Sequence, residues 1–155
     1  SAYRKSLAKT DVPYTPAVTL IRGLKVALDT IHAIGLERVW ARTALLAAAT
    51  RAAAGAMGLK VFSRQPSDSV TGIVYPEGVD DKFRKVLESK YGCAVAGGQD
   101  ALKGKVCRIS HMGYVDPLDT IGLIAAMEYA FAACGAPVEI GAGVAAAAGV
   151  LKDWQ

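Results

Sequence analysis

Residues 106–117 read Val-Cys-Arg-Ile-Ser-His-Met-Gly-Tyr-Val-Asp-Pro, and this stretch predicts a strand followed by a helix. The first four residues place β-branched and small apolar side chains around Arg108, as a short strand does. Asp116 is a favoured helix N-cap, and a proline at the next position costs no helical hydrogen bond, so the helix begins there and ends at Gly135. The sequence therefore places an arginine inside a strand, directly ahead of its most clearly delimited helix.

Helices and short strands alternate along the rest of the chain. Thr15, before Pro16, is a capping residue for a helix over 16–33. The order of elements predicts an α+β fold in which a small, mostly antiparallel sheet is covered by helices on one side. We expect 1–35 to form a lead-in segment with a connecting helix and 36–155 to form a small α+β domain. The other expected elements are helices over 36–57, from Asp80 or Asp81 to Gly92, and over 143–154, and strands over 60–63, 69–75 and 93–96.

The composition fits one close-packed domain of 155 residues. Hydrophobic residues make up 52% of the chain but aromatic residues only 7%, and much of the apolar content is supplied by 28 alanines and 16 glycines. The net charge of +4 comes from 18 scattered basic and 14 acidic residues, without the basic patch that a nucleic-acid partner requires. The longest uncharged run, 140–151, is shorter than the about 20 residues of a membrane helix, so no membrane partner is expected.

Most patterns that carry catalytic chemistry are absent from the sequence. The three cysteines, Cys93, Cys107 and Cys134, include no Cys-x-x-Cys pair, so neither a disulfide framework nor a closed zinc site is expected, and a reducing cytoplasm is the expected compartment. Cys107, inside the strand, is predicted to be a small buried apolar residue. Two histidines are too few for a three-histidine metal site, and the nucleophile-elbow, P-loop and dinucleotide-binding patterns do not occur.

Arg108 is the residue whose position needs a functional explanation. Alternation along the strand places it on the face shared by Val106 and Ser110, where burying a guanidinium without an anionic partner is costly. Its planar fork suits a carboxylate bound through two parallel hydrogen bonds. The carboxylate belongs either to a ligand or to an acidic side chain of the same domain, such as Glu88 or Glu128.

Gly97 and Gly98, one strand away from Arg108, give a second indication of a binding site. Paired glycines at a strand end allow a ligand to approach the backbone, although they also form ordinary turns. If Arg108 binds a ligand, its guanidinium should border an open concave surface, and residues 97–103 should border the same surface.

Three stretches of the sequence occur in the order and spacing of a known family. They are Tyr14-Thr15-Pro16-Ala17-Val18 ahead of a helix, Ala96-Gly97-Gly98-Gln99-Asp100 with Leu102-Lys103-Gly104-Lys105, and residues 106–113 as quoted above. Together they resemble the C-terminal part of the class V aminotransferases, the alanine–glyoxylate and serine–pyruvate group of fold-type-I enzymes that depend on pyridoxal phosphate. The resemblance covers nearly the whole chain.

The resemblance implies the C-terminal, small domain of an enzyme that moves an amino group between alanine or serine and glyoxylate or pyruvate. Arg108 matches the family's substrate-carboxylate arginine, and Gly97 and Gly98 match the loop beside the substrate. Thr15 matches a threonine that reaches the cofactor phosphate of the neighbouring subunit. Pyridoxal phosphate, a homodimer and an N-terminal large domain are implied with them. Ser110 departs from the glycine that the family usually has there.

None of the ten lysines matches the family's cofactor lysine, so we expect the isolated chain neither to bind pyridoxal phosphate covalently nor to transaminate.

Two further interpretations remain beside that of an aminotransferase domain. A non-catalytic module that binds amino acids or another subunit is the alternative. Some relatives of the family carry the name soluble hydrogenase small subunit; because three dispersed cysteines cannot supply a nickel–iron or iron–sulfur site, we expect aminotransferase architecture under that name too.

Overall fold

The computed structural model describes residues 1–152 and 154 and divides the chain into two compact units, 1–39 and 40–155. The smaller unit contains α1 (Ala2–Leu7) and α2 (Val18–Ile34). The helix α1 was not expected from the polar, turn-rich start of the sequence. The helix α2 begins two residues later than predicted: its N-cap is Ala17, which offers no side-chain oxygen, and Thr15 lies outside the helix rather than capping it.

The larger unit is built on a four-stranded sheet in the order β1-β2-β4-β3, in which every neighbouring pair is antiparallel. The fold class predicted from the sequence is thereby confirmed. The strand expected over 93–96 lies further along the chain, because pairing with β4 begins only at Ala96. The strands are β1 (Lys60–Val61), β2 (Val70–Val74), β3 (Ala96–Gly97) and β4 (Val106–Ser110).

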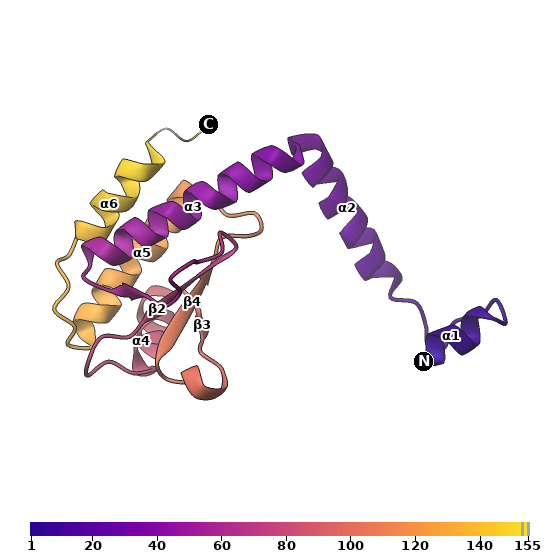
Figure 1. The fold of residues 1–155 in the computed structure, drawn as a ribbon, viewed down its shortest axis with the longest axis horizontal. Helices are drawn as coiled ribbons and strands as arrows, with labels where there is room; N and C mark the ends of the chain where they lie inside the picture. Colours follow the sequence, from indigo (N-terminus) through magenta and orange to yellow (C-terminus); the bar gives the residue numbers. More distant parts are fainter. Residues whose placement is uncertain (153, 155) are drawn as a thin grey trace. The chain divides into compact units, whose positions relative to one another are not determined.

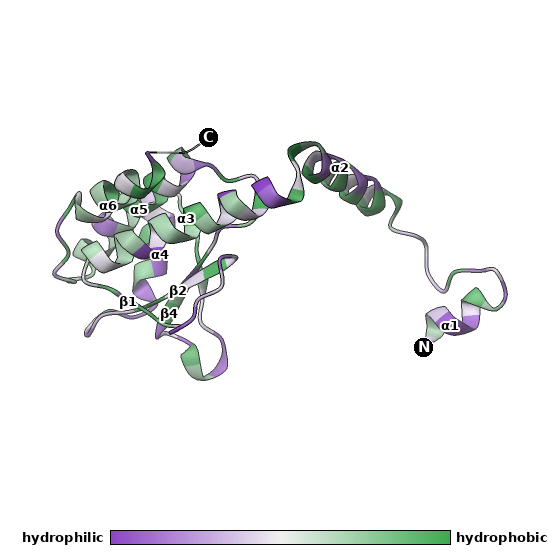
Figure 2. Cartoon of the chain, turned by 45° about the horizontal axis from the view of Figure 1, so that its top comes forward, coloured by the Kyte–Doolittle hydropathy of each residue, from purple (hydrophilic) through white to green (hydrophobic). Residues whose placement is uncertain are grey.

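Helices cover one face of this sheet. The views in Figures 1 and 2 agree that α3, α5 and α6 lie side by side over the strands. The covered face carries Ile73 of β2 and Cys107 of β4, which are fully buried; Cys107 is thus the buried apolar residue that its position predicts. The helices are α3 (Leu36–Ala56), which crosses the boundary between the units, α4 (Lys82–Tyr91), α5 (Pro117–Ala133) and α6 (Ala142–Leu151), with a 3-10 turn, η1, at Asp100–Leu102.

Two aromatic rings join α4 to α5 at the centre of the core. The rings of Phe83 and Phe131 stack with centroids 3.9 Å apart, and both side chains are fully buried. The helix α5 begins with a capping box, in which Asp116 and Asp119 each accept a backbone hydrogen bond from the other residue. The N-terminus predicted at Asp116 is therefore confirmed, and its local chemistry explains why it could be predicted.

Glu128 in the middle of α5 is buried, although a glutamate usually is not. Its carboxylate accepts hydrogen bonds from the backbone N–H groups of Gly141, Gly143 and Val144, at 2.7, 2.7 and 3.1 Å. These are the unpaired donors at the N-terminus of α6, where the helix dipole also favours a negative charge. Glu128 therefore links α6 to α5, and its carboxylate is paired with these N–H groups and not with Arg108.

Candidate functional site

Arg108 lies in the middle of β4 on the face of the sheet opposite Cys107. Its direct partners across the two neighbouring strands are Gly72 in β2 and Ala96 in β3, so no side chain larger than a methyl group stands opposite it. The guanidinium Nε donates a hydrogen bond to the carbonyl oxygen of Gly97 at 2.9 Å. Within residues 1–152 and 154, no carboxylate pairs with Arg108, and its two terminal nitrogens make no hydrogen bond.

The two acidic residues considered as internal partners are thus engaged elsewhere or are exposed. Glu128 binds the start of α6, and Glu88 lies at the surface of α4 without an ion pair in the described part of the chain. The half-buried guanidinium of Arg108 therefore keeps one edge anchored and one edge available. Such an edge can bind a carboxylate through two parallel hydrogen bonds.

Gly97 and Gly98 serve two different purposes in this geometry. Gly97 supplies the carbonyl that anchors Arg108. A Cβ at Gly98 would lie 2.0 Å from the carbonyl oxygen of Leu102, so the space beside Gly98 is filled by the 3-10 turn of its own loop. The structure brings Arg108 and Gly97 into contact beside Gly98, and the turn explains the absence of a side chain at Gly98.

A second arginine, which was not predicted from the sequence, lies against the same glycine. Arg84 of α4 donates from Nε to the carbonyl oxygen of Val95 at 2.9 Å and from Nη1 to Asp81 at 2.8 Å. Tyr75 donates its hydroxyl to the other oxygen of Asp81 at 3.1 Å. The available signal was the spacing of Asp81 and Arg84, which are three residues apart on one helical face.

The groups around this cluster keep their protons. Burial raises the pKa of the Tyr75 phenol far above its ordinary value, and the charge of Asp81 adds to the effect. Burial also raises the pKa of the Cys107 thiol to about 12. Tyr75 therefore stays a hydrogen-bond donor to Asp81, and Cys107 stays a neutral thiol with no nucleophilic character at neutral pH.

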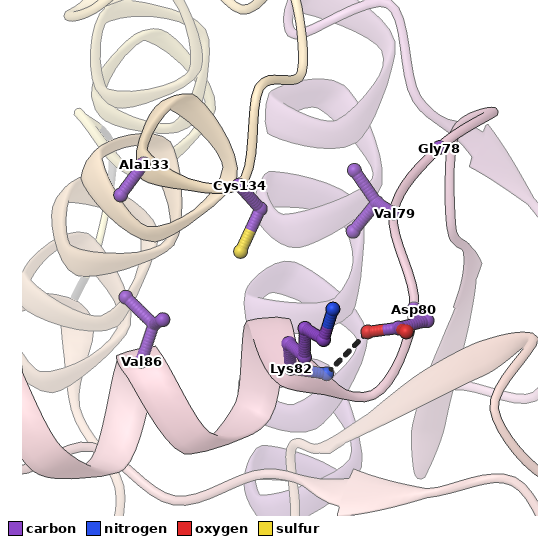
Figure 3. A pocket seen from close by; sticks show the side chains of 7 residues that line it. All are labelled: Gly78, Val79, Asp80, Lys82, Val86, Ala133 and Cys134. Atoms are coloured by element: carbon purple, nitrogen blue, oxygen red, sulfur yellow. Dashed lines mark hydrogen bonds between the residues drawn. The ribbon is translucent and has the colours of Figure 1, made fainter.

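A cavity of about 310 Å³ lies elsewhere in the larger unit, between α4 and the end of α5 (Figure 3). In the close-up, the thiol of Cys134 points toward Val86 and Lys82. Burial raises the pKa of this thiol, which makes it less reactive. Neither Arg108 nor Gly97 lines the cavity. Its lining residues are Gly78, Val79, Asp80, Lys82, Val86, Ala133 and Cys134.

His111, directly after β4, is buried and forms part of a structural contact. Its Nε2 and the hydroxyl of Thr71 are 2.9 Å apart, and its backbone N–H donates to the carbonyl of Ser69. Burial lowers the pKa of His111 to about 4, and the charge of Arg51 acts in the same direction. A neutral imidazole that is already bonded in the core holds the end of β4 in place and is not arranged for proton transfer.

Thr15 belongs to the smaller unit and is exposed. Its hydroxyl makes no hydrogen bond within the described residues, so it can donate one to a phosphate oxygen. In the described part of the chain, no three His, Cys, Asp or Glu side chains gather into a group that could hold a metal ion. No helix there is both long and apolar enough to cross a membrane.

Comparisons with known proteins place this architecture. No family model matches the chain. Over 97% of its own residues, the chain is 40% identical to the soluble hydrogenase small subunit of Synechococcus. Over 91% of its own residues, it is 42% identical to the serine–glyoxylate aminotransferase of Methylorubrum extorquens. The crystal structure of pyridoxamine–pyruvate aminotransferase from Mesorhizobium loti superposes on 90% of the chain with a TM-score of 0.85 at 40% identity. The chain spans 40%, 36% and 37% of these three proteins, respectively.

The architecture is that of the C-terminal, small domain of a fold-type-I transferase of the kind that uses pyridoxal phosphate. More particularly, the homologues and structural neighbours of the chain are class V aminotransferases, and the chain corresponds to a partial, C-terminal domain of such a protein. The resemblance stated from the three sequence stretches is thereby confirmed. The soluble hydrogenase name does occur among the relatives, and the fold is nevertheless that of the aminotransferases.

Proposed function

We propose that the chain is the substrate-binding, C-terminal domain of a pyridoxal-phosphate-dependent aminotransferase. The enzyme moves an amino group between a small amino acid, alanine or serine, and glyoxylate or pyruvate. The observation that carries this proposal is the anchored guanidinium of Arg108, whose free edge has no carboxylate partner in the described residues. The relatives support it, because their names include transaminases of glyoxylate and of pyruvate.

Arg108 binds the substrate carboxylate in this proposal. Two parallel hydrogen bonds from its terminal nitrogens fix both the distance and the plane of the carboxylate. The α-carbon and its amino or oxo group then point away from the sheet in one orientation, which removes most of the rotational freedom that would otherwise oppose reaction. Gly97 keeps the arginine in this orientation through its carbonyl oxygen. Bound pyridoxal phosphate supplies the electron sink for the bonds broken at the α-carbon.

Thr15 contributes to the cofactor site of the neighbouring subunit in a homodimer. Its exposed hydroxyl would donate a hydrogen bond to the cofactor phosphate. The lysine that carries the cofactor belongs, in this proposal, to an N-terminal large domain outside residues 1–155. The three cysteines are all unpaired, which supports the cytoplasm as the compartment.

The helix α2 supports the existence of that large domain. It buries none of its residues, although many of them are apolar, as the green colour of α2 in Figure 2 shows. A stripe of this kind on a soluble helix is normally covered by another part of the protein. We assign this cover to the N-terminal large domain. The exposed apolar residues are Val18, Leu20, Ile21, Leu24, Val26, Leu28 and Ile31.

The decisive experiment uses the complete protein that carries this chain, loaded with pyridoxal phosphate. Replacing Arg108 with alanine should weaken the binding of the transition state of carboxylate substrates by about 2–5 kcal/mol, which lowers kcat/KM roughly 30- to 4,000-fold. The matched control is Arg64→Ala, which removes an exposed arginine from a loop of the same domain and should leave kcat/KM unchanged. Equal kcat/KM for Arg108→Ala and the unmodified enzyme would remove Arg108 from the substrate site.

The isolated chain provides the opposite test. We expect residues 1–155 to show no transaminase turnover and no pyridoxal phosphate that survives dialysis. Calorimetry of the isolated chain with alanine, serine and glyoxylate distinguishes the alternative function: tight binding without any cofactor would favour an amino-acid-binding module over an enzyme domain.

A further inference from the structure

Gly97 is in contact with two arginine side chains that come from different elements. Arg108 of β4 donates from Nε to its carbonyl oxygen at 2.9 Å. Arg84 of α4 occupies the place where a side chain would be: a Cβ built on Gly97 lies 2.6 Å from Nη1 of Arg84 and 3.2 Å from its Cζ. Only a glycine allows the second guanidinium to lie this close to the backbone.

The strand that contains Gly97 makes few hydrogen bonds with the rest of the sheet. The strand β3 is two residues long, stands at the edge of the sheet and pairs only with β4. A strand this short at an edge is held by few ladder hydrogen bonds. Arg84 adds a bond from outside the sheet, since its Nε donates to the carbonyl of Val95, the residue before the strand.

Arg84 is itself held from two directions. Its Nη1 donates to Asp81 at 2.8 Å, and Asp81 accepts the hydroxyl of Tyr75 at 3.1 Å. The Tyr75 side chain is only 7% exposed and follows directly after β2, so the far end of the network is fixed in the core. The two guanidiniums differ in what they leave free: Arg84 uses both Nε and Nη1 inside the protein, whereas Arg108 uses only Nε.

We propose that Arg84 is a positioning residue for the carboxylate site. By holding residues 95–97, it fixes the carbonyl that orients Arg108, and with it the angle at which Arg108 presents its terminal nitrogens to the substrate carboxylate. Arg84 touches neither substrate nor cofactor in this role. The inference rests on the proposed function of Arg108 and adds the residues that set its geometry.

The test measures carboxylate affinity in the complete protein loaded with pyridoxal phosphate. Arg84→Gln should raise the calorimetric Kd for glyoxylate and the KM for glyoxylate roughly 10-fold, because a misaligned fork loses one of its two hydrogen bonds. The kcat at saturating glyoxylate and the affinity for pyridoxal phosphate should stay within about two-fold. Arg84→Lys keeps the charge beside Asp81 but cannot bond Val95 at the same time, so it should restore only part of the affinity.

Arg51→Gln is the matched control. Arg51 also forms an ion pair with an aspartate, Asp68, at 2.8 Å, and it makes no bond to residues 95–97. Its loss removes a comparable ion pair from the same unit, and the Kd for glyoxylate should not change. An equal loss of affinity in Arg51→Gln and Arg84→Gln would show that Arg84 acts only through general stability, which overturns the proposal.

A double substitution tests the geometry directly. Gly97→Ala adds a methyl group where the guanidinium of Arg84 lies, so it should raise the Kd for glyoxylate in the unmodified protein. In the Arg84→Ala background the methyl group has room, and Gly97→Ala should then add nothing. Two effects that multiply independently would contradict the proposal, because residues in contact are expected to be coupled.

Arg108→Ala separates this inference from the proposed function. If Arg108→Ala weakens glyoxylate binding and Arg84→Gln does not, Arg84 has no positioning role and the function of Arg108 stands. If neither variant changes the Kd for glyoxylate, both the positioning role and the substrate role are wrong. Weaker binding in both variants, with Arg51→Gln unchanged, is the expected result.

Discussion

The helices α2 and α5 are both 17 residues long and rich in apolar side chains, yet α2 is exposed and α5 lies in the core. No residue of α2 is buried. In α5, by contrast, seven residues are buried, and α4 and α6 pack against it. The buried residues of α5 are Thr120, Ile124, Ala126, Met127, Glu128, Ala130 and Phe131.

The difference shows what an apolar helix face does and does not specify. The face of α2 carries many apolar residues, but none of them is buried by its own unit. The helix α5 is covered by elements that follow or precede it closely in the chain. An apolar stripe therefore predicts that a face is covered, and only the tertiary structure shows whether the cover lies within the same unit.

The largest expected effect comes from truncating one large apolar side chain in each helix. Phe131→Ala should lower the free energy of unfolding of the larger unit by about 3–5 kcal/mol, because it removes a fully buried ring stacked on Phe83. Leu24→Ala in α2, where the side chain is 58% exposed, should cost less than about 0.5 kcal/mol in the isolated chain. Urea denaturation followed by circular dichroism measures both. A large cost for Leu24→Ala would show that α2 is covered within this chain.

Glu128 offers the next largest effect, since it is a buried charge on the covered helix. Glu128→Ala leaves the N–H groups at the start of α6 without their acceptor and should destabilise the larger unit by about 2–3 kcal/mol. Hydrogen exchange should show the loss first in residues 141–145. Glu139→Ala, which removes an exposed acid from the loop before α6, is the control and should change stability by less than about 0.5 kcal/mol.

The two histidines extend the comparison to pH, because His111 is buried in the larger unit and His32 is exposed on α2. Burial lowers the pKa of His111 from 6.5 to about 4. Between these two pH values the unfolded chain binds a proton at His111 that the folded chain does not bind. The contribution of His111 to the free energy of unfolding is therefore present above pH 6.5 and is lost as the pH falls toward 4.

Because of this proton linkage at His111, the free energy of unfolding should fall by about 2 kcal/mol between pH 7 and pH 5. Denaturation at a series of pH values measures it. His111→Asn should remove this part of the pH dependence, while His32→Asn should leave it intact. An unchanged profile in His111→Asn would assign the acid sensitivity to other groups.

The smallest expected effect concerns the first turns of the two helices. Asp116→Ala removes the capping box of α5 and should cost about 1 kcal/mol of unfolding free energy. The N-cap of α2 is Ala17, which makes no side-chain bond, so Ala17→Asp should instead raise the helix content of residues 18–34. Urea denaturation measures the loss of unfolding free energy in Asp116→Ala, and backbone chemical shifts measure the gain of helix in Ala17→Asp. No gain from Ala17→Asp would show that the backbone at that position does not allow a cap.

Elements with a local chemical cause were predictable from the sequence. The start of α5 follows from Asp116 and Pro117, and the end of α4 follows from Gly92, which adopts the left-handed conformation that favours glycine. The start of α2 was placed two residues too early, because a threonine before a proline is a good cap in isolation but the helix begins only after Ala17. The strand before Gly98 was also misplaced, because its extent depends on pairing with β4.

Within the candidate site, the strand position of Arg108 followed from alternation alone. Its anchor, the carbonyl of Gly97, was not predictable, since it depends on the register between β3 and β4. The part played by Arg84 was missed for the same reason. Its partners Val95 and Asp81 lie on different elements, and the contact with Gly97 exists only when α4 packs beside the sheet.

The sequence by itself determined the α+β class, the start of α5 at Asp116, the end of α4 at Gly92, and the face of β4 on which Arg108 stands. These depend on backbone preferences and periodicities that act over a few neighbouring residues. The tertiary structure decided that Glu128 caps α6, that Arg84 holds the residues beside Gly97, and that α2 buries nothing within residues 1–39. These depend on contacts between residues distant in the chain, and such contacts exist only once packing has brought their elements together.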